Sequence, residues 1–465
     1  MSDPLQALAS VPAQAWLVGG ALRDRLLGRV STDFDVALAR DSEPGQVARA
    51  LAQKAGGFAF SLSDAFGAWR VTARDRSWQV DLMGIVGADI EADLRRRDLT
   101  VNAIAQPVSA PQGLIDPCGG QADLAAGRLR AVSASAFADD PVRTLRLARL
   151  ACELNFKAEP ETTRLAAASS AELATVASER VFAELRRLLC SERPVDGLKL
   201  MDAIGATEAV LPELAALRGI GQSRFHHLDV LDHTRAVVAE TVALEHAPEA
   251  VFGPAAPALA EFLAAPLANE LTRGQALRFG ALLHDIAKPQ TRAETSEGRV
   301  TFMHHDETGA AVVASILTRL RASERLIGHV AALTRHHLRL GFLVHHTPLD
   351  RRHIYRYLDA CAPVGVDVTV LSVADRLATR GENAQGAIDR HLELAGQILP
   401  AALEWTDAPP RPPIRGDELC TALGIGPGPQ LGELLHELEE AAYAGEVRSR
   451  EEAIGYAREL VGPDR

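Results

Sequence analysis

The first part of the chain alternates apolar and turn-forming residues in the manner of a small sheet. Five segments show the period-two alternation or the short apolar run that is typical of strands: residues 15–18, 32–36, 58–62, 68–73 and 78–83. The glycine pair Gly19-Gly20 follows the first strand, and a short helical stretch leads to the second. Residues 45–54 have the spacing of a helix that ends at Gly56-Gly57. The pattern predicts a mixed α/β head.

Beyond this head the spacing of apolar residues is helical almost throughout. We expect a head at residues 1–137, a helical neck at 138–218, a second helical domain at 219–400 and a C-terminal helical module at 401–465. An Ala/Pro-rich segment at 247–267 is expected to be a loop or insertion. The fold class is therefore α+β, with one small mixed sheet and a helical remainder.

Size and composition are those of an ordinary soluble protein. The chain has 465 residues, 47% of them hydrophobic and 24% charged, which suggests about three domains. The formal net charge of −12 disfavours a nucleic-acid partner unless arginines gather locally, because phosphate binding depends on clustered positive charge. Such clusters exist, with a solvated basic face as the alternative reading: residues 95–97, Arg143, Arg146 and Arg149 at spacing three, and Arg186-Arg187.

Disulfide and membrane classes are disfavoured by the same sequence. The five cysteines are scattered without a Cys-x-x-Cys pair, which argues against a disulfide framework or a thiolate zinc site. The N-terminus lacks a basic region, and the most apolar stretch, 247–271, is interrupted by charges and prolines. We expect a cytoplasmic protein with no membrane partner.

Two aspartates in the second strand are the first candidates for chemistry. In Asp33-Phe34-Asp35 the period of two sends both carboxylates to one face. Neighbouring carboxylates suit Mg²⁺, which is usually held by a few carboxylates together with substrate phosphates. Gly19 and Gly20 lack a Cβ, so their N–H groups could approach a triphosphate closely. The stretch predicts a phosphoryl-transfer site, whereas its alternative interpretation is a solvated strand edge after a plain turn.

The order Gly-Gly-x-x-Arg-Asp followed by Asp-x-Asp resembles the head signature of the class II tRNA nucleotidyltransferase and bacterial poly(A) polymerase family. The resemblance implies a polymerase-beta-like head in which Asp33 and Asp35 hold two Mg²⁺ ions. It also implies nucleotide contacts from Gly19, Gly20 and Arg23, and a third carboxylate, Asp81, that could take the proton of the attacking hydroxyl. A strand aspartate that only faces water is the alternative for Asp81.

The segment Arg95-Arg-Arg-Asp-Leu-Thr-Val-Asn102-Ala resembles the Arg-Arg-Asp-Phe-Thr-x-Asn-Ala motif of that family, with Leu99 in place of Phe. Arginine forks match triphosphate oxygens, so the resemblance implies nucleotide binding by Arg96, Arg97, Asp98 and Asn102. In family members that add all three nucleotides, a longer insertion precedes this motif. Here only residues 83–94 intervene, which resembles enzymes that add CC.

The segment Asp139-Asp-Pro-Val-Arg143 resembles the family's Glu-Asp-x-x-Arg motif, which reads the incoming base. A carboxylate accepts from the exocyclic amine of C or A, and a guanidinium donates to ring acceptors. We expect Asp140 to cap a helix that starts at Pro141, with Arg143, Arg146 and Arg149 along it as nucleotide-binding residues. Ser178 to Leu185 resembles the family's neck helix, so the resemblance covers most of residues 15–215.

A second set of residues resembles the HD phosphohydrolase superfamily: His233, His284-Asp285, His305, His337 and Asp375. Imidazoles and carboxylates together suit a divalent transition metal and an activated water. Adjacent helical residues point about 100° apart, so His284 and Asp285 reach one metal only if it lies astride their edge. Structural histidines, or an HD fold used only to contact tRNA, are the alternatives, and the HD domain is expected at 219–400.

These features together predict a template-independent tRNA nucleotidyltransferase that adds C to the tRNA 3′ end from CTP and releases pyrophosphate, with addition of A from ATP left open. The alternatives are a poly(A) polymerase, an HD hydrolase whose head only binds nucleotide, and a non-catalytic RNA-binding protein. The oligomeric state, the metal of the HD site and the surface that contacts tRNA are not indicated by the sequence.

Overall fold

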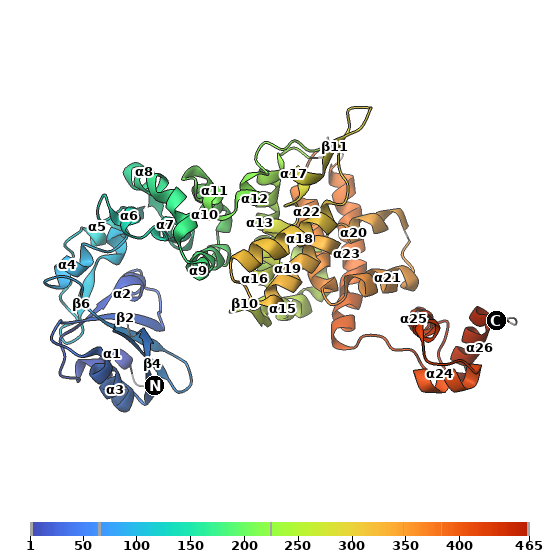
Figure 1. The fold of residues 1–465 in the computed structure, drawn as a ribbon, viewed down its shortest axis with the longest axis horizontal. Coiled ribbons are helices and arrows are strands. Elements are labelled where there is room, and N and C mark those ends of the chain that lie inside the picture. Colours follow the sequence, from blue (N-terminus) through green and yellow to red (C-terminus); the bar gives the residue numbers. More distant parts are fainter. Residues whose placement is uncertain (1–2, 64–66, 224–225, 347, 383, 463–465) are drawn as a thin grey trace. The chain divides into compact units, whose positions relative to one another are not determined.

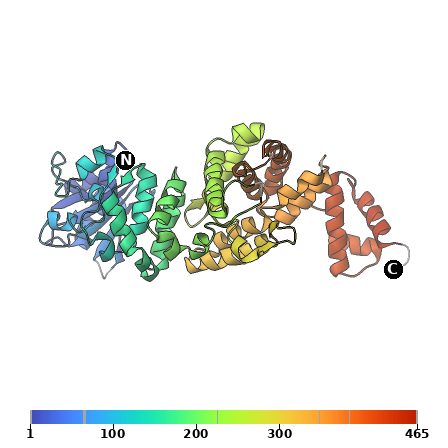
Figure 2. The same ribbon diagram turned by 90° about the horizontal axis from the view of Figure 1, so that it is seen from above.

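The computed structural model describes residues 3–63, 67–223, 226–346, 348–382 and 384–462. The chain divides into two compact units, Met1–Val210 and Leu211–Arg465, which Figures 1 and 2 show from two directions. The first unit contains the sheet and a group of helices, and the second is built almost entirely of helices. The predicted α+β class is confirmed.

The first unit is organised on a six-stranded mixed sheet. Its order is β3-β4-β5-β2-β1-β6, and the strands are β1 (Ala15–Val18), β2 (Asp33–Leu38), β3 (Gly57–Ser63), β4 (Ala68–Ala73), β5 (Gln79–Gly84) and β6 (Ala105–Pro107). Only β2 and β5 run parallel, and the other neighbouring strands are antiparallel. The five predicted strands all form, within two residues of their predicted ends.

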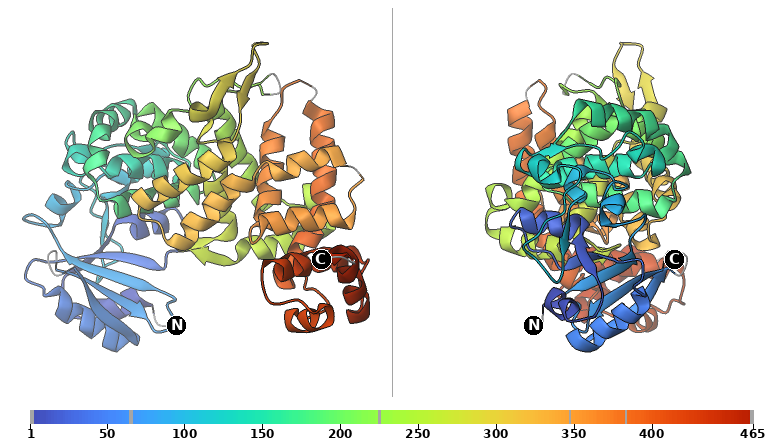
Figure 3. Two further views of the ribbon diagram at one scale, coloured as in Figure 1. Left: turned by 45° about the vertical axis from the view of Figure 1, so that its right-hand side comes forward. Right: turned by 90° about the vertical axis from the view of Figure 1, so that its left-hand side faces the viewer.

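One face of this sheet is fully covered and the other only in part. Val36, Val71 and Val80 pack under α1 (Pro4–Ala9) and α3 (Pro44–Ala55), which Figure 3 shows in blue along one side of the strands. On the opposite face, a cluster that includes Trp16, Val18 and Ala37 packs against α4 (Ile90–Leu94). The remainder of that face, on β2, β5, β4 and β3, carries polar and exposed side chains.

Two glycines that the sequence predicted to form turns lie at helix ends in the structure. Helix α3 ends at Gly56, which adopts the left-handed conformation with φ 76°, as the glycine pair predicted. Gly19 makes the predicted turn with φ 70° and is also the first residue of α2 (Gly19–Leu26). The neck helices follow the sheet: α7 (Arg143–Leu154), α8 (Pro160–Ser169), α9 (Ser178–Leu189), α10 (Pro194–Ala203) and α11 (Ala206–Val210).

Two local predictions are wrong. The segment 247–267 is not a loop, because it forms α14 (Glu249–Phe252), a 3₁₀ turn and α15 (Ala256–Ala264). Its alanines favour helix, and Pro257 lies in the first helical turn, where proline is tolerated. Asp140 does not cap α7 with its side chain: α7 begins at Arg143, and no side chain caps it.

The second unit is a helical domain followed by a small C-terminal module. Its principal helices are α13 (Val230–His246), α16 (Arg273–Leu283), α18 (His305–Arg319), α19 (Glu324–His336), α21 (Arg351–Cys361), α22 (Gly365–Ala378), α23 (Ala384–Asp407), α24 (Gly416–Leu423), α25 (Pro429–Ala444) and α26 (Arg450–Val461). The last three form their own apolar core. All five cysteines of the chain are free thiols.

Aromatic and ionic contacts join that module to the helical domain. The rings of Tyr355, Trp405 and Tyr443 pack together, with centroids 5.3 to 5.7 Å apart. Beside them, Arg352 on α21 donates to Glu440 at 2.9 Å and to Glu446 at 2.7 Å. The first contact is nearly buried on the glutamate side, so this arginine is a central anchor for α25.

Among the described residues, no single helix is long and apolar enough to cross a membrane. One pair, Arg351–Cys361 with Gly365–Ala378, meets the test of length and composition together, but the two helices are bent by 98° at the break between them.

Helix α2 offers a direct test of how much the head depends on its core. Leu22 is fully buried, whereas Leu26, on the same helix, is 40% exposed. We expect Leu22→Ala to lower the free energy of unfolding by about 2–5 kcal/mol, because it leaves a cavity. The matched change Leu26→Ala should cost far less. Urea denaturation measured by circular dichroism compares the two, and equal costs would contradict the packing described here.

Candidate functional site

Three carboxylates lie together on the partly open face of the sheet. Asp33 and Asp35 are two residues apart on β2, so both side chains project from one face. The parallel neighbour β5 pairs in a register that sets Asp81 opposite Asp35. Adjacent strands thus bring all three predicted catalytic carboxylates together.

The start of α2 approaches this group closely because residue 19 is a glycine. β1 pairs Val18 with Asp35, and the chain turns at Gly19 with φ 70°. A Cβ at Gly19 would lie 2.9 Å from Oδ2 of Asp35 and 3.3 Å from Nη1 of Arg97, so any other residue would collide there and would also be strained. No side chain caps α2, which leaves its first N–H groups available to an anion.

Burial raises the pKa of Asp35 above its ordinary value. Arg97 opposes this effect, while the charges of Asp33 and Asp81 add to it. Asp35 keeps solvent access, and with two further carboxylates beside it the group is a set of hard oxygen donors, which is the donor chemistry of Mg²⁺. The residues present therefore fit a divalent cation.

Arg70 is a member of this group that the sequence analysis missed. It lies opposite Asp81 on β4 and donates two hydrogen bonds to it, Nε to Oδ1 at 2.6 Å and Nη2 to Oδ2 at 2.7 Å. The contact raises the pKa of Arg70. Both oxygens of Asp81 are thus engaged by one guanidinium. The alternation of residues 68–73 predicts the face from which Arg70 projects. Its partner Asp81 follows only from the pairing of β4 with β5.

The arginines of the Arg-Arg-Asp segment differ in their surroundings. Arg97 donates to Asp93 at 3.2 Å and lies beside Gly19 and Asp35. The side chain of Arg96 is exposed, and its backbone carbonyl accepts from Arg143 at 3.0 Å. Arg97 is therefore placed at the carboxylate group, whereas Arg96 faces solvent.

Asp98 and Asn102 form the buried start of a polar network. Asp98 is 4% exposed and accepts from Asn102 at 3.0 Å and from Nη1 of Arg146 at 3.2 Å, while Asn102 accepts from Arg23 at 2.8 Å. Burial alone would raise the pKa of Asp98, but Arg146 and the hydrogen bonds outweigh it, and the pKa lies below its ordinary value.

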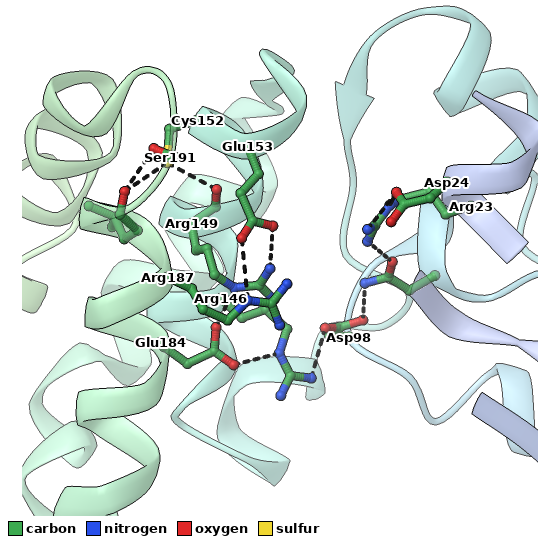
Figure 4. Close-up of polar contacts among 12 residues, drawn as sticks. Arg23, Asp24, Asp98, Arg146, Arg149, Cys152, Glu153, Glu184, Arg187 and Ser191 are labelled. Carbon is green, nitrogen blue, oxygen red and sulfur yellow. Dashed lines mark hydrogen bonds and ion pairs between the residues drawn. The ribbon is translucent and has the colours of Figure 1, made fainter. Parts of the chain in front are cut away.

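Figure 4 shows this network continuing, within the first unit, from the segment beside the sheet into the neck helices. Arg146 donates to Glu184 at 3.0 Å, and Arg149 donates to the other oxygen of Glu184 at 2.6 Å. Arg149 also pairs with Glu153, whose other oxygen lies 3.4 Å from Arg187. Arg149 is 4% exposed, so it has little surface to offer a ligand and instead holds Glu184 in place.

The two residues expected to read the base lie next to each other at the start of α7. Asp140 accepts from Arg180 at 2.7 Å, and its Oδ2 lies 4.0 Å from Nε of Arg143. Arg143 donates to the carbonyl of Ala136 at 2.8 Å.

The segment between β5 and α4 is short, since only residues 85–89 separate the two elements. The structure therefore has no long insertion before the Arg-Arg-Asp segment, as the sequence indicated.

In the second unit, the six predicted HD residues converge from five helices or their ends. They fall into two groups, each with ligand atoms within 4.8 Å of one another: His233, His284 and Asp375, and Asp285, His305 and His337. His284 is the C-cap of α16 and Asp285 follows it. His284 and Asp285, although adjacent in sequence, therefore belong to different groups, which agrees with the different directions expected for their side chains.

The imidazoles are oriented as metal ligands are. Nδ1 of His284, His305 and His337 lies 2.9, 2.7 and 2.6 Å from backbone carbonyls, and a carbonyl only accepts, so Nδ1 carries the proton and Nε2 presents its lone pair. Nε2 of His233 lies 3.0 Å from Oδ1 of Asp375, and Nε2 of His284 lies 3.1 Å from Oδ2 of Asp285. Imidazole nitrogens and carboxylate oxygens gathered in this way are a donor set that fits divalent transition metals.

The pKa values at this centre shift in different directions: burial alone would lower the pKa of His284, but Asp285 outweighs it and raises that pKa. Burial lowers the pKa of His337 to about 4, which favours the neutral form that binds metal. Burial alone would raise the pKa of Asp285, but His284 and Lys288 hold it well below its ordinary value. Nζ of Lys288 lies 2.6 Å from Oδ2 of Asp285 and donates to Gln222 at 2.7 Å.

Comparison with known protein families identifies three segments of the chain. Residues 15–130 match the Poly A polymerase head domain, and residues 258–380 match the HD domain. Residues 155–217 match the family described as "Probable RNA and SrmB- binding site of polymerase A". The match to the polymerase head contains the three carboxylates, and the match to the HD domain contains five of the six HD residues.

Relatives similar over almost the whole chain carry specific names. An A-adding tRNA nucleotidyltransferase of Deinococcus radiodurans is 37% identical over 97% of this chain and 96% of its own length. A CC-adding tRNA nucleotidyltransferase of Thermus thermophilus is 34% identical over 96% of this chain and 93% of its own. One of these relatives is thus named for adding A and the other for adding CC.

Solved structures of similar fold include an apo CCA-adding enzyme, with a TM-score of 0.65 and 19% identity, covering 100% of this chain and 96% of that one. The Thermotoga maritima CCA-adding enzyme complexed with tRNA has a TM-score of 0.61 and 18% identity, covering 98% and 94%. At this identity the likeness establishes the fold.

The buried network predicts a large cost for losing its central carboxylate. Glu184→Ala leaves Arg146 and Arg149 without a shared partner, and removing one member of a buried ion pair costs about 3–5 kcal/mol. We expect the midpoint of urea denaturation of the first unit to fall clearly. The control is Glu161→Ala, which breaks an exposed pair with Arg164 and should change the midpoint little. Matching midpoints for the two variants would refute the role given to Glu184.

Proposed function

The chain belongs to the tRNA nucleotidyltransferase family, and on that premise we propose that it adds C to the 3′ end of tRNA from CTP without a nucleic-acid template. The observation that carries the proposal is the group of Asp33, Asp35 and Asp81 on one sheet face beside the start of α2. A tRNA substrate also implies activity in the cytoplasm.

The reaction joins the 3′-hydroxyl oxygen of tRNA to the α-phosphorus of the nucleotide and releases pyrophosphate in line. Asp33 and Asp35 would hold Mg²⁺, which when bound lowers the charge on the phosphates and favours the deprotonated hydroxyl. The uncapped N–H groups of α2, together with Arg97, would hold the triphosphate. These groups lie around Asp35 within the same part of the head.

Asp81 was expected to take the proton of the attacking hydroxyl. Its two hydrogen bonds to Arg70 argue for a different task, because protonation would break the ion pair. We assign to Asp81 the role of third carboxylate in the group that holds the cation and orients the attacking hydroxyl. Arg70 fixes the position of the Asp81 side chain.

Base selection is assigned to Asp140 and Arg143, with Arg146 held behind them by Asp98 and Glu184. A carboxylate accepts from the exocyclic amine of C or A and a guanidinium donates to the ring acceptors, so G and U present unsuitable groups. Exposed Arg96 and the glycine pair would contact the triphosphate side of the same nucleotide. Buried Arg149 supports the selection indirectly.

The assignment to C addition rests on the short segment 85–89 between β5 and α4. The similar relatives are named as A-adding in one case and CC-adding in others, so addition of A from ATP is the alternative. Both names favour tRNA over the generic RNA of a poly(A) polymerase.

One assay separates these possibilities. Labelled CTP or ATP with Mg²⁺ is supplied to tRNA transcripts that end before CCA, to transcripts that end after CC, and to a generic RNA. We expect two C residues on the first substrate. Incorporation of A on the second substrate alone would identify an A-adding enzyme, and tailing of generic RNA with ATP a poly(A) polymerase.

Asp33→Ala with Asp35→Ala should lower incorporation at least about a thousand-fold, because several kcal/mol of charge stabilisation depend on the cation. Asp41→Ala, a change of the same kind at an exposed position of the head, is the control and should leave the rate unchanged. Incorporation that survives the double change would defeat the site assignment.

We further propose that the second unit is a metal-dependent phosphohydrolase acting on phosphomonoesters or 2′,3′-cyclic phosphodiesters. The supporting observation is the pair of three-residue groups whose ligand atoms lie within 4.8 Å of one another. Metals bound there would supply an activated water. Lys288, beside Asp285, would offer its ammonium group to a substrate phosphate.

Metal content and hydrolysis test this second activity together. With Mn²⁺, Ni²⁺ or Co²⁺ supplied, we expect the purified chain to retain metal and cleave 2′,3′-cyclic AMP. His337→Ala should lower metal affinity by more than the roughly 10- to 100-fold that loss of an outer hydrogen-bond partner costs. His345→Ala, an exposed histidine in the same unit, is the control. A wild-type chain that neither retains metal nor cleaves the substrate would exclude the activity, and nucleotide addition to tRNA should be unaffected throughout.

A further inference from the structure

Two phenylalanines on the edge strand β3 are exposed on the face that carries the carboxylates. Phe58 is 60% exposed and Phe60 is 45% exposed. β3 stands at the end of the sheet order, next to β4. Large exposed aromatic residues on an edge strand promote aggregation, and where they persist they commonly mark a surface that binds a partner.

The strand register places these rings relative to the active carboxylates. Phe60 pairs with Arg70, Arg70 with Asp81, and Asp81 with Asp35. Paired residues on neighbouring strands project from the same face, so one row across the sheet runs from Phe60 to Asp35. Phe58 begins the adjacent row, which passes through Thr72 and Gln79 to Asp33.

Positive charge accompanies the rings. The guanidinium of Arg74 lies 5.8 Å from the centre of the Phe58 ring, and Arg74 and Arg76 are both exposed. Exposed aromatic rings next to arginines, on one face of a sheet, make a surface that binds single-stranded nucleic acid by base stacking and phosphate contact.

We propose that Phe58 and Phe60 form a stacking platform for the unpaired nucleotides just upstream of the reacting 3′-hydroxyl, with Arg74 meeting their phosphates. The inference rests on the proposed addition of nucleotides to RNA. Strands lie about 4.8 Å apart, so Phe60, three strands from Asp35, is about 14 Å from it along the sheet. The last few unpaired nucleotides of a substrate whose end lies at Asp35 reach that far.

The alternative occupant is a second copy of this chain that pairs along β3. The arginines favour RNA, because each unpaired nucleotide brings a base for the rings together with a phosphate for Arg74. Stacking does not distinguish one base from another. The platform therefore selects an unpaired tail over a blunt end and leaves the choice of the added base to the nucleotide site.

The test compares the double variant Phe58→Ser/Phe60→Ser with the double variant Phe58→Trp/Phe60→Trp. Stacking is worth about 1–3 kcal/mol per base, so loss of both rings should raise the KM for tRNA at least about 30-fold, whereas the KM for CTP stays within about two-fold. The tryptophan variant, which keeps two stacking rings, should have a KM for tRNA close to that of the wild type. Phe342→Ser, at a ring that is 62% exposed in the second unit, is the matched control and should leave both constants unchanged.

A parallel binding measurement keeps this inference separate from the proposed function. Fluorescence anisotropy of a labelled single-stranded RNA octamer should show weaker binding to the serine variant whether or not the wild-type chain transfers nucleotides. Absence of transfer by the wild type with this difference intact would defeat the proposed function alone. Wild-type-like binding and an unchanged KM for tRNA in the serine variant would overturn the platform. If that variant also changes the sedimentation of the chain, the surface is an interface between copies.

Discussion

The arrangement of the head depends on the close approach of the backbone at Gly19 to the carboxylate of Asp35. Without a Cβ, the chain can leave β1 at a positive φ and start α2 directly against β2. That approach brings the uncapped N–H groups of a helix to the same place as a carboxylate that solvent can reach. Cation and phosphate can then be bound side by side, which neither the strand nor the helix could achieve alone.

The buried ion pairs explain how a chain with a net charge of −12 uses its arginines. Arg146 and Arg149 pair with Glu184, and Arg146 also donates to Asp98 in the Arg-Arg-Asp segment. These contacts couple the base-selecting helix α7 to the Arg-Arg-Asp segment through direct hydrogen bonds. The spacing of three that suggested a basic face instead marks a helix whose positive side is largely neutralised inside the unit.

Sequence patterns predicted the strands and the facing of Asp33 and Asp35 because the period of two is a local property. They did not reveal that Arg70 holds Asp81, since that contact depends on which strands become neighbours. The helices within 247–267 were missed because composition was weighed above the helix preference of alanine. The convergence of the HD residues from five helices was expected only through resemblance to a family, because nothing in the spacing of His233 and Asp375 brings them together.

The packing of Trp405 against Tyr355 and Tyr443 has a spectroscopic consequence. The chain contains four tryptophans, and the other three, Trp16, Trp69 and Trp78, belong to the first unit. Trp405 alone reports from the second unit, at the seam between α23 and the C-terminal module. In a chain whose other indoles are replaced by phenylalanine, intrinsic emission would follow detachment of that module without any attached label.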